Sequence, residues 1–231
     1  MQAPTDPMLT KLIDAALPHV AFDGWGEVAF QAAVADAEID PEQARQICPR
    51  GAVDLAIGYH KAGDEAMRQA MGAADLGNMR YRDKVAYAIR LRLEAVDDKE
   101  AVRRGSTLFA LPHMAPEGAR LIWGTADAIW TALGDTSDDV NWYTKRATLS
   151  AVYSSVVLYW LGDDSVDGQA THDFIDRRIE DVMQVERVKA AVRKSPILKP
   201  FTGPLDRLAG LIKPPRQTAA MDLPGMWREP D

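Results

Sequence analysis

Apolar residues recur at steps of three and four along most of this chain, the spacing that gathers them on one face of an α-helix. No segment alternates strictly between apolar and polar residues, so we predict an all-α fold. The first helix is expected to end near Pro18, because proline ends or kinks a helix. The expected helices cover residues 8–19, 27–38, 41–48, 52 onward, 80–96, 99–109, 116–133, 139–161 and 167–194.

The most regular pattern runs from Pro116, which suits a first helical turn, to Gly134, which suits a helix end. Its apolar face is formed by Ala119, Ile122, Trp123, Ala126, Ile129, Trp130 and Leu133. Candidate N-caps for the next helix follow at Asp135, Ser137 and Asp138. That helix begins with Trp142 and Tyr143 among polar neighbours, a composition typical of an exposed anchor on another protein.

Residues 1–51 have the proportions of a helix-turn-helix head, and with the long helix that follows they resemble TetR regulators. Asp40 and Pro41 make a good N-cap and first-turn pair for its third helix. DNA binding needs cations to meet phosphates. Residues 1–70 carry five Lys or Arg against eleven Asp or Glu, and the third helix offers only Arg45 as a cation. We therefore expect a degenerate head that binds no nucleic acid.

The chain has the opposite charge near its end: residues 187–216 carry eight Lys or Arg against one Asp. Within residues 195–216 the pattern predicts a short amphipathic helix that lies on a membrane surface, because about ten residues cannot span a bilayer. The membrane-binding residues are expected to be Leu198, Phe201, Leu205, Leu208, Leu211 and Ile212. Docking of this helix on its own or a sister subunit is the alternative. Residues 217–231 are expected to be a disordered tail.

Composition indicates a globular protein, since 47% of its 231 residues are hydrophobic and 26% are charged. The single cysteine, Cys48, excludes an internal disulfide and is expected in the core. The longest uncharged stretch, residues 147–162, falls short of the roughly twenty residues that a spanning helix needs. Four arginines of the fifth helix are expected on its solvated face: Arg80, Arg82, Arg90 and Arg92.

Catalytic and metal-binding patterns are missing from the sequence. None of the four histidines follows a glutamate by three positions, as a di-iron site in a helical bundle requires. A segment that starts like a calcium loop at Asp163 has Phe174 at its twelfth position instead of glutamate. There is no phosphate loop, nucleophile elbow or Cys/His couple. We expect a protein without enzymatic activity, cofactor or metal.

Three motifs carry a resemblance to a known family. Residues 111–123 read LPxxxPEGxRLIW, residues 134–146 read GDxSxDxNWYTKR, and residues 173–179 read DFIDRRI. From about residue 12 to about residue 211 the chain resembles the accessory proteins of ubiquinone (coenzyme Q) biosynthesis that form the ninth protein of that set. These are TetR-like, lipid-binding proteins that assist the di-iron hydroxylase acting on demethoxyubiquinone.

The resemblance implies a lipid-binding and dimerising bundle over residues 52–194, with a cavity between helices. From the residues alone a filled core would look the same. The lipid-binding residues are expected to be Leu111, Ile122, Trp123, Val152, Tyr153 and Val156. A surface patch for the hydroxylase is expected at Ile129, Asp139, Trp142 and Tyr143.

The main functional hypothesis is therefore a homodimeric accessory protein that binds an isoprenoid or quinone intermediate at the membrane and presents it to demethoxyubiquinone hydroxylase. A TetR-like, ligand-responsive transcriptional regulator is the alternative, and a helical homodimer without a ligand is a third reading. The first twenty residues lack the features of a signal or transit peptide. The expected location is therefore a bacterial cytoplasm, peripheral on the inner membrane.

Overall fold

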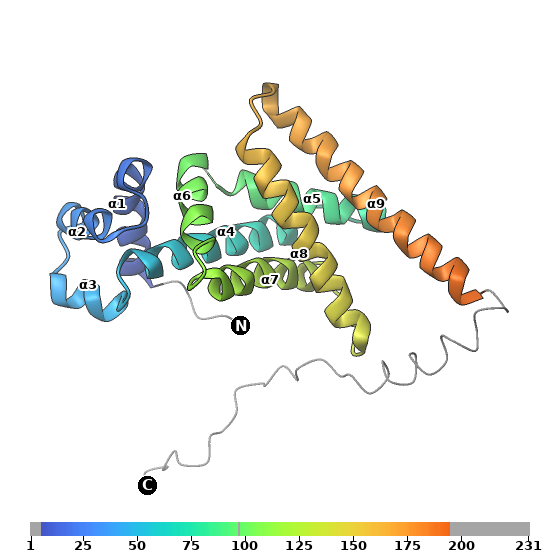
Figure 1. The fold of residues 1–231 in the computed structure, drawn as a ribbon, viewed down its shortest axis with the longest axis horizontal. Coiled ribbons are helices and arrows are strands. Elements are labelled where there is room, and N and C mark those ends of the chain that lie inside the picture. Colours follow the sequence, from blue (N-terminus) through green and yellow to red (C-terminus); the bar gives the residue numbers. More distant parts are fainter. Residues whose placement is uncertain (1–5, 97, 195–231) are drawn as a thin grey trace, which may run out of the picture.

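The computed structural model describes residues 6–96 and 98–194, with side chains described as far as residue 184. Within these residues all regular structure is helical, as predicted (Figure 1). The elements are α1 (Pro7–Asp23), α2 (Glu27–Asp36), α3 (Pro41–Ile47), α4 (Ala52–Ala73), α5 (Tyr81–Glu94), α6 (Lys99–Phe109), α7 (Ala115–Ala132), α8 (Val140–Leu161), the 3-10 turn η1 (Val166–Gly168) and α9 (Gln169–Lys194).

The predicted start of the third helix is confirmed. The side chain of Asp40 accepts a hydrogen bond of 3.0 Å from the backbone nitrogen of Gln43, and Pro41 opens α3. Asp6 caps α1 in the same way and is followed by Pro7. Aspartate before proline therefore starts two of the three helices of the head, because the side chain satisfies a free N–H and proline needs none.

The predicted end of the first helix is wrong, since α1 continues through Pro18 to Asp23. Leu12, Ala16 and Val20 are fully buried along this helix. Their spacing of four keeps one face packed, mainly against α2, on both sides of the proline. This burial outweighs the single backbone hydrogen bond that proline removes.

The predicted N-cap of α8 also differs from the structure. Asp139 caps the helix by accepting a hydrogen bond from the backbone nitrogen of Asn141. Asp135 and Ser137, expected as caps, instead accept hydrogen bonds from Nζ of Lys145 at 2.7 and 2.6 Å. Gly134, with a φ of 73°, ends the preceding helix region as predicted.

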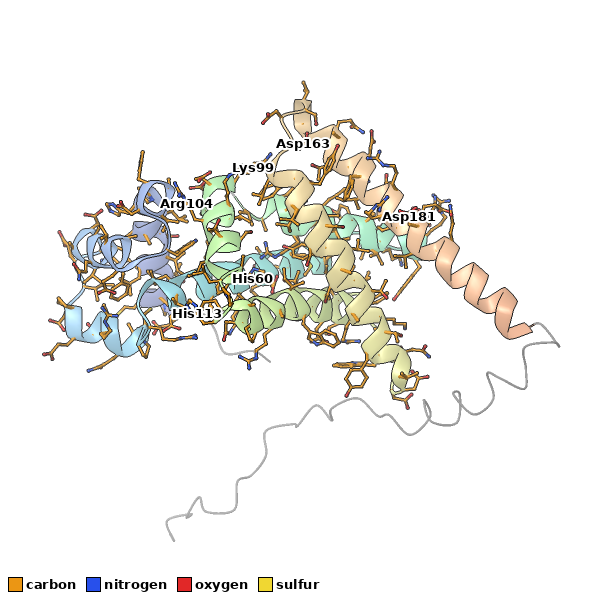
Figure 2. All side chains as sticks on the ribbon, viewed as in Figure 1. His60, Lys99, Arg104, His113, Asp163 and Asp181 are labelled. Atoms are coloured by element: carbon orange, nitrogen blue, oxygen red, sulfur yellow. The ribbon has the colours of Figure 1, made fainter. Side chains whose placement is uncertain are left out.

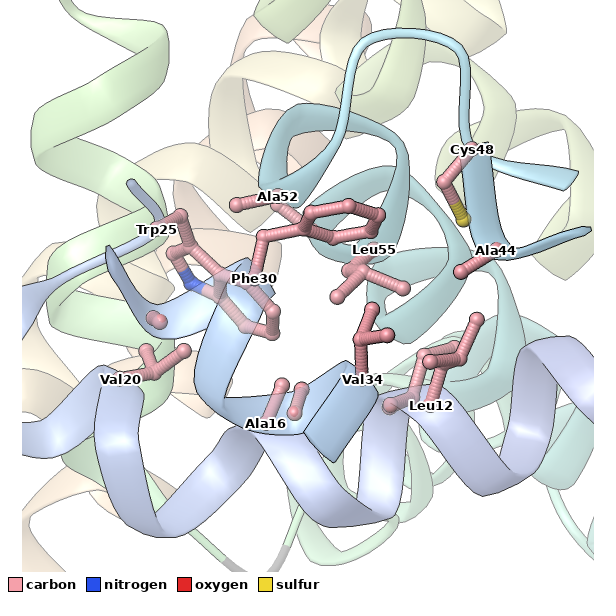
Figure 3. Packing of buried hydrophobic residues seen from close by; sticks show 14 of the residues in the cluster. Leu12, Ala16, Val20, Trp25, Phe30, Val34, Ala44, Cys48, Ala52 and Leu55 are labelled. Carbon is pink, nitrogen blue, oxygen red and sulfur yellow. The ribbon is translucent and has the colours of Figure 1, made fainter. Parts of the chain in front are cut away.

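The head has its own core (Figure 3), which joins α1, α2, α3 and the beginning of α4. Cys48 lies in it with no exposed surface, and burial raises the pKa of its thiol to about 11. The prediction that Cys48 is a small core residue is therefore confirmed. Ala101 of α6 belongs to the same core, so the head is packed onto the rest of the molecule.

Helix α4 leads from the head into the body (Figure 1), where it packs against α5 and α7. Helix α8 crosses α7, and α9 packs against both α8 and α5. A second core fills the space between these helices, centred on Met67, Ile89, Ile129, Val156 and Ile175. The body is thus built from α4, α5, α7, α8 and α9 around this second core.

The expectation of a solvated arginine face on α5 is wrong for Arg92, which is only 3% exposed. Arg80, Arg82 and Arg90 reach solvent to a greater extent and pair with carboxylates. Arg92 follows the buried Ile89 by three residues, so it points to the inward face of the helix. It is tolerated there because it meets a buried partner, described below.

Candidate functional site

A cavity of about 290 Å³ lies between the head and the body. Helices α4, α5, α6, α7 and α8 all contribute to its wall, together with Trp25 from the turn between α1 and α2. Most of the lining is apolar. The polar side chains that reach it are Tyr59, His60, Arg92, Ser106, Tyr153 and Ser154.

Trp25 connects the head to this cavity. Its indole nitrogen donates a hydrogen bond of 2.9 Å to the backbone oxygen of Ala101 in α6. Its ring lies 5.7 Å from that of Tyr59 on α4. The preceding Gly24 has a φ of 69°, a backbone conformation that a side chain would strain. Trp25 was not predicted as a site residue, and its only signal in the sequence was a large ring between two glycines.

Four polar side chains form a connected cluster in the apolar interior, beside the cavity. The Nε of Arg92 donates to Oδ1 of Asp64 at 2.6 Å, and an Nη donates to the backbone oxygen of His60 at 2.9 Å. The hydroxyl of Thr125 lies 2.8 Å from the same Asp64 oxygen and 2.9 Å from Nε2 of His60. The cluster thus joins α4, α5 and α7, and Figure 2 shows His60 near the middle of the molecule.

The hydrogen bonds of this cluster fix the state of His60. Thr125 has one hydroxyl hydrogen, and the carboxylate of Asp64 beside Arg92 can only accept it. With its hydrogen donated to Asp64, Thr125 is placed to accept a hydrogen bond from Nε2 of His60. Burial and the charge of Arg92 lower the pKa of His60 to about 4, so the ring is neutral at neutral pH.

A glycine makes room for the buried guanidinium. A Cβ atom placed on Gly63 of α4 would lie 2.5 Å from an Nη of Arg92 and 2.7 Å from its Cζ. Both distances are too short for any side chain at this position. Gly63 therefore allows α5 to place a planar cation flat against α4.

The lipid-binding residues predicted from the family resemblance do not all lie at this cavity. Ile122 and Tyr153 line it. Val152 lines a separate hollow between α5, α8 and α9, and Val156 is fully buried in the body core. Trp123 lies in an aromatic cluster outside the cavity, and Leu111 is 43% exposed after the end of α6. These assignments stay predictions, but two of the six residues line the cavity.

The aromatic cluster consists of Trp123, Trp142 and Tyr143, at the place where α7 and α8 meet. The rings of Trp142 and Tyr143 are 4.8 Å apart, edge to face, and that of Trp123 lies 6.0 Å from Trp142. All three side chains are half-buried. The cluster brings together two of the four residues predicted for partner binding, and Asp139 lies close by as the cap of α8.

Ile129 must be removed from the predicted surface patch, because it has no exposed surface. It precedes Leu133 by four residues and faces the body core. The same apolar spacing that predicted a helix here also placed Ile129 inside it, so a surface role contradicted the pattern.

A buried ionic network centred on Arg146 lies against the aromatic cluster and fixes the position of Trp142. Arg146 is 2% exposed, and it donates to Asp127 at 2.6 Å and to Asp135 at 3.1 Å. Its guanidinium lies 4.0 Å from the centre of the Trp142 ring. Burial raises the pKa of Asp135, but hydrogen bonds from Lys145, Ser137 and Arg146 outweigh it and hold that pKa at about 2. The loop between α7 and α8 is thus fixed by charged groups.

The predicted membrane-binding residues, from Leu198 to Ile212, and the predicted tail lie outside the described residues. Among the residues that are described, no helix has the length and apolar character needed to cross a membrane. In the same part of the chain, no three His, Cys, Asp or Glu side chains converge in a way that would hold a metal ion.

Comparison with known proteins identifies similar chains. The family model described as COQ9 matches residues 115–186, which include α7, α8 and most of α9. The chain is 28% identical over 194 residues to a probable ubiquinone biosynthesis protein, coq9, mitochondrial, of Dictyostelium discoideum, a match that covers 80% of this chain and 62% of that protein. It is 29% identical over 192 residues to ubiquinone biosynthesis protein COQ9, mitochondrial, of Drosophila melanogaster, covering 80% and 58%.

The human protein of the same name is 32% identical over 114 residues, which cover 49% of this chain and 35% of that protein. The chain therefore spans less than two thirds of the length of each of these relatives. The resemblance to ubiquinone-biosynthesis proteins that the three motifs indicated is confirmed.

Among solved structures, the chain is similar to a TetR transcriptional regulator from Nitrosomonas europaea. The TM-score is 0.63 at 18% identity, and the match covers 76% of this chain and 97% of that one. At this identity the likeness concerns the fold alone. The prediction of a TetR-like helical bundle is confirmed.

The predicted location in a bacterial cytoplasm is wrong, because the relatives above are named mitochondrial proteins. That prediction rested on the composition of the first twenty residues. Part of each relative lies outside the matched region, so the start of this sequence was no basis for assigning a compartment.

Proposed function

We propose that this chain acts in ubiquinone biosynthesis as a lipid-binding accessory protein, which holds an isoprenoid or quinone intermediate and presents it to demethoxyubiquinone hydroxylase. The observation that carries the proposal is the largely apolar cavity at the junction of head and body. The names of the relatives supply the pathway. The sequence motifs indicate the same pathway, whereas the cavity alone would not identify it.

The size of the cavity defines what it can hold. Its 290 Å³ lies at the lower end of the range for small-molecule sites, which starts near 300 Å³. It suits a ring and the first part of a tail rather than a whole polyprenyl chain. Each CH₂ group leaving the bilayer for water costs about 0.8 kcal/mol. A protein that takes up the head while most of the tail stays in lipid avoids the largest part of that cost.

Binding without chemistry is supported by how the polar side chains at the cavity are used. The candidate acid–base pair is His60, which lines the cavity, and Asp64, whose carboxylate lies 3.8 Å from it. His60 is hydrogen-bonded to Thr125, and Asp64 is paired with Arg92 as well as Thr125. Both groups are thus held by structural hydrogen bonds, which favours a binding role over a catalytic one.

The surface proposed for the hydroxylase is the aromatic cluster of Trp123, Trp142 and Tyr143, together with Asp139. Half-buried aromatic rings on a rigid support are typical anchors of protein interfaces. The network around Arg146 provides that support, since it holds the Trp142 ring at 4.0 Å. The cluster therefore offers both a large contact area and a fixed geometry.

Attachment to a membrane surface is proposed for residues 195–216 on the basis of their sequence, which combines apolar and basic residues. Deletion of this segment is expected to abolish flotation of the protein with anionic liposomes. Unchanged flotation would refute the assignment. The homodimer also stays a prediction, which the mass of the native protein would test.

A TetR-like regulator is the second candidate, because a solved structure with a similar fold is a transcriptional regulator. Two cations of the head are already paired, Arg45 with Glu27 and Arg50 with Asp54. An acidic head with paired arginines is a poor match to phosphates. A gel-shift assay at low salt would reveal any DNA binding, since it would be strongest there.

Native mass spectrometry of the protein purified from cells tests the main proposal. We expect a co-purified isoprenoid or quinone with the wild type and its loss in Val157→Trp, which would fill the cavity. Val166→Trp is the matched control, because Val166 is 82% exposed and does not line the cavity. Absence of such a lipid from every preparation, or equal retention in both variants, would contradict the proposal.

A further inference from the structure

The wall of the cavity is not uniform, because two almost completely buried polar side chains reach it from two different helices. Arg92 on α5 and Tyr153 on α8 are each 3% exposed, and both line the cavity. Donors buried in an apolar cavity are costly unless they find an acceptor. The hydrogen bonds that these two residues make, and those that they lack, therefore indicate which ligand group the cavity binds.

Each of these residues has a donor left over. Arg92 uses Nε for Asp64 and one Nη for the backbone oxygen of His60. Its other Nη makes no hydrogen bond with any side chain or backbone group in the described part of the chain. The hydroxyl of Tyr153 likewise makes no hydrogen bond with a side chain or backbone group in the described part of the chain. Arg92 and Tyr153 thus each keep a donor without a protein acceptor, and both side chains line the same apolar cavity.

The charge of this wall decides which acceptor fits. The carboxylate of Asp64 lies 2.6 Å from the guanidinium of Arg92 and neutralises it. Burial lowers the pKa of His60 to about 4, so its ring adds no positive charge at neutral pH. An anionic head would have to compete with Asp64 for Arg92. A neutral oxygen accepts the free hydrogens without disturbing that pair.

We propose that Arg92 and Tyr153 form a head-group subsite that binds a neutral ring oxygen of the lipid, the carbonyl of a quinone or the oxygen of a phenol, with the tail lying along the apolar wall of α6 and α7. This inference rests on the proposed function, and it adds which end of the lipid enters and which residues recognise it. The subsite distinguishes an oxygenated ring from a plain isoprenoid hydrocarbon and from a phosphorylated one.

The test uses the full-length protein, Tyr153→Phe and the control Tyr159→Phe. Tyr159 is on the same helix, but it stacks on Phe174 and does not line the cavity. Three probes are titrated calorimetrically: a benzoquinone with a two-isoprene tail, the hydrocarbon squalene, and farnesyl diphosphate. Loss of one hydrogen bond should weaken quinone binding by Tyr153→Phe roughly threefold to tenfold. Squalene binding should not change, and Tyr159→Phe should behave like the wild type with every probe.

The possible outcomes separate this inference from the function on which it rests. If the wild type binds quinone and squalene, but Tyr153→Phe binds quinone as tightly as the wild type, the subsite is refuted and the lipid-binding function stands. Tighter binding of farnesyl diphosphate than of quinone would refute the neutral head group. If the wild type binds neither quinone nor squalene, the proposed function and the subsite both fail. Thermal unfolding of each variant confirms that an affinity change reflects binding rather than folding.

Discussion

The Nε atom of Arg92 lies 2.6 Å from Oδ1 of Asp64, and both side chains are almost fully buried, at 3% and 6% exposure. They come from the inward faces of two neighbouring helices, α5 and α4, next to the cavity. A buried ion pair of this kind contributes little net stability as a pair, but each partner depends strongly on the other.

Removal of one partner should therefore cost more than removal of both. We expect Arg92→Met to lower the free energy of unfolding by about 3–5 kcal/mol, because Asp64 is left buried and uncompensated. The double variant Asp64→Leu/Arg92→Met should recover a large part of that loss. Urea denaturation of the single and double variants measures the coupling, and strictly additive losses would show that the two residues act independently.

Any side chain at Gly63 should lower the stability of the protein, because a Cβ there would lie 2.5 Å from the guanidinium of Arg92. Gly63→Ala is expected to destabilise the protein by about 1–3 kcal/mol as the buried group shifts. Gly124→Ala is the matched control, since Gly124 is also inside a helix and a Cβ there meets nothing within 4 Å. That change should be neutral or stabilising by up to about 1 kcal/mol. Thermal unfolding distinguishes the two, and equal effects would contradict the steric argument.

Stability should fall as the pH is lowered from neutrality, because His60 is buried in its neutral form. Its pKa is about 4 in the folded protein against 6.5 for an ordinary histidine. The contribution is present above pH 6.5 and is lost as the pH falls from 6.5 towards 4, since only the unfolded chain binds the proton in that range. Between pH 7 and pH 5 the loss should be about 2 kcal/mol.

His60→Gln should remove this part of the pH dependence, because glutamine can still donate to Thr125 but does not titrate. The carboxylates contribute the same pH dependence to both proteins, so the difference between wild type and variant reports His60 alone. Denaturant midpoints at pH 7, 6 and 5 provide the measurement. Parallel curves for the two proteins would mean that His60 is not held neutral in the folded state.

Arg146 should be essential for the stability of the α7–α8 junction. Arg146→Met removes one of the two cations that pair with Asp135, the only cation near its Oδ2 oxygen among the described residues, and the cation beside the Trp142 ring. The expected cost is about 3 kcal/mol, as for other broken buried pairs. Arg178→Met, which breaks an exposed pair with Asp181, should cost less than about 0.5 kcal/mol. Similar costs for both variants in urea denaturation would argue against the network.

Trp142→Lys should abolish capture of the hydroxylase by the immobilised protein, because it places a charge within the proposed aromatic contact. Phe22→Lys is the control, since Phe22 is 84% exposed on α1 in the head, outside the aromatic cluster. Circular dichroism verifies that both variants are folded. Capture that survives Trp142→Lys would mean that the docking surface lies elsewhere.

The helices were predictable because their signals are local. Apolar spacing, together with Asp40 before Pro41 and Gly134 after α7, gave the fold class and most helix limits within a few residues. Pro18 was misread because its effect on α1 is decided by packing against α2. Long-range burial outweighs a local signal whenever the apolar face continues past it.

The site was less predictable, because it is formed by residues whose meaning depends on pairing across helices. Tyr153 and Ile122 were found through the family resemblance, while Trp25, Asp64 and Arg92 were not. One signal was available: Arg92 falls at the helical spacing of Ile89, and Asp64 precedes the buried Met67 by three residues. An arginine and an aspartate on the apolar faces of two helices indicate a buried ion pair. The sequence around each residue does not show that these two helices pack against each other.

Trp25 belongs both to the core of the head and to the wall of the cavity, and its hydrogen bond to Ala101 joins the two. Trp25 therefore couples the space available to a guest to the position of the first three helices. Occupancy and head orientation are then linked equilibria, so each biases the other by the same free energy.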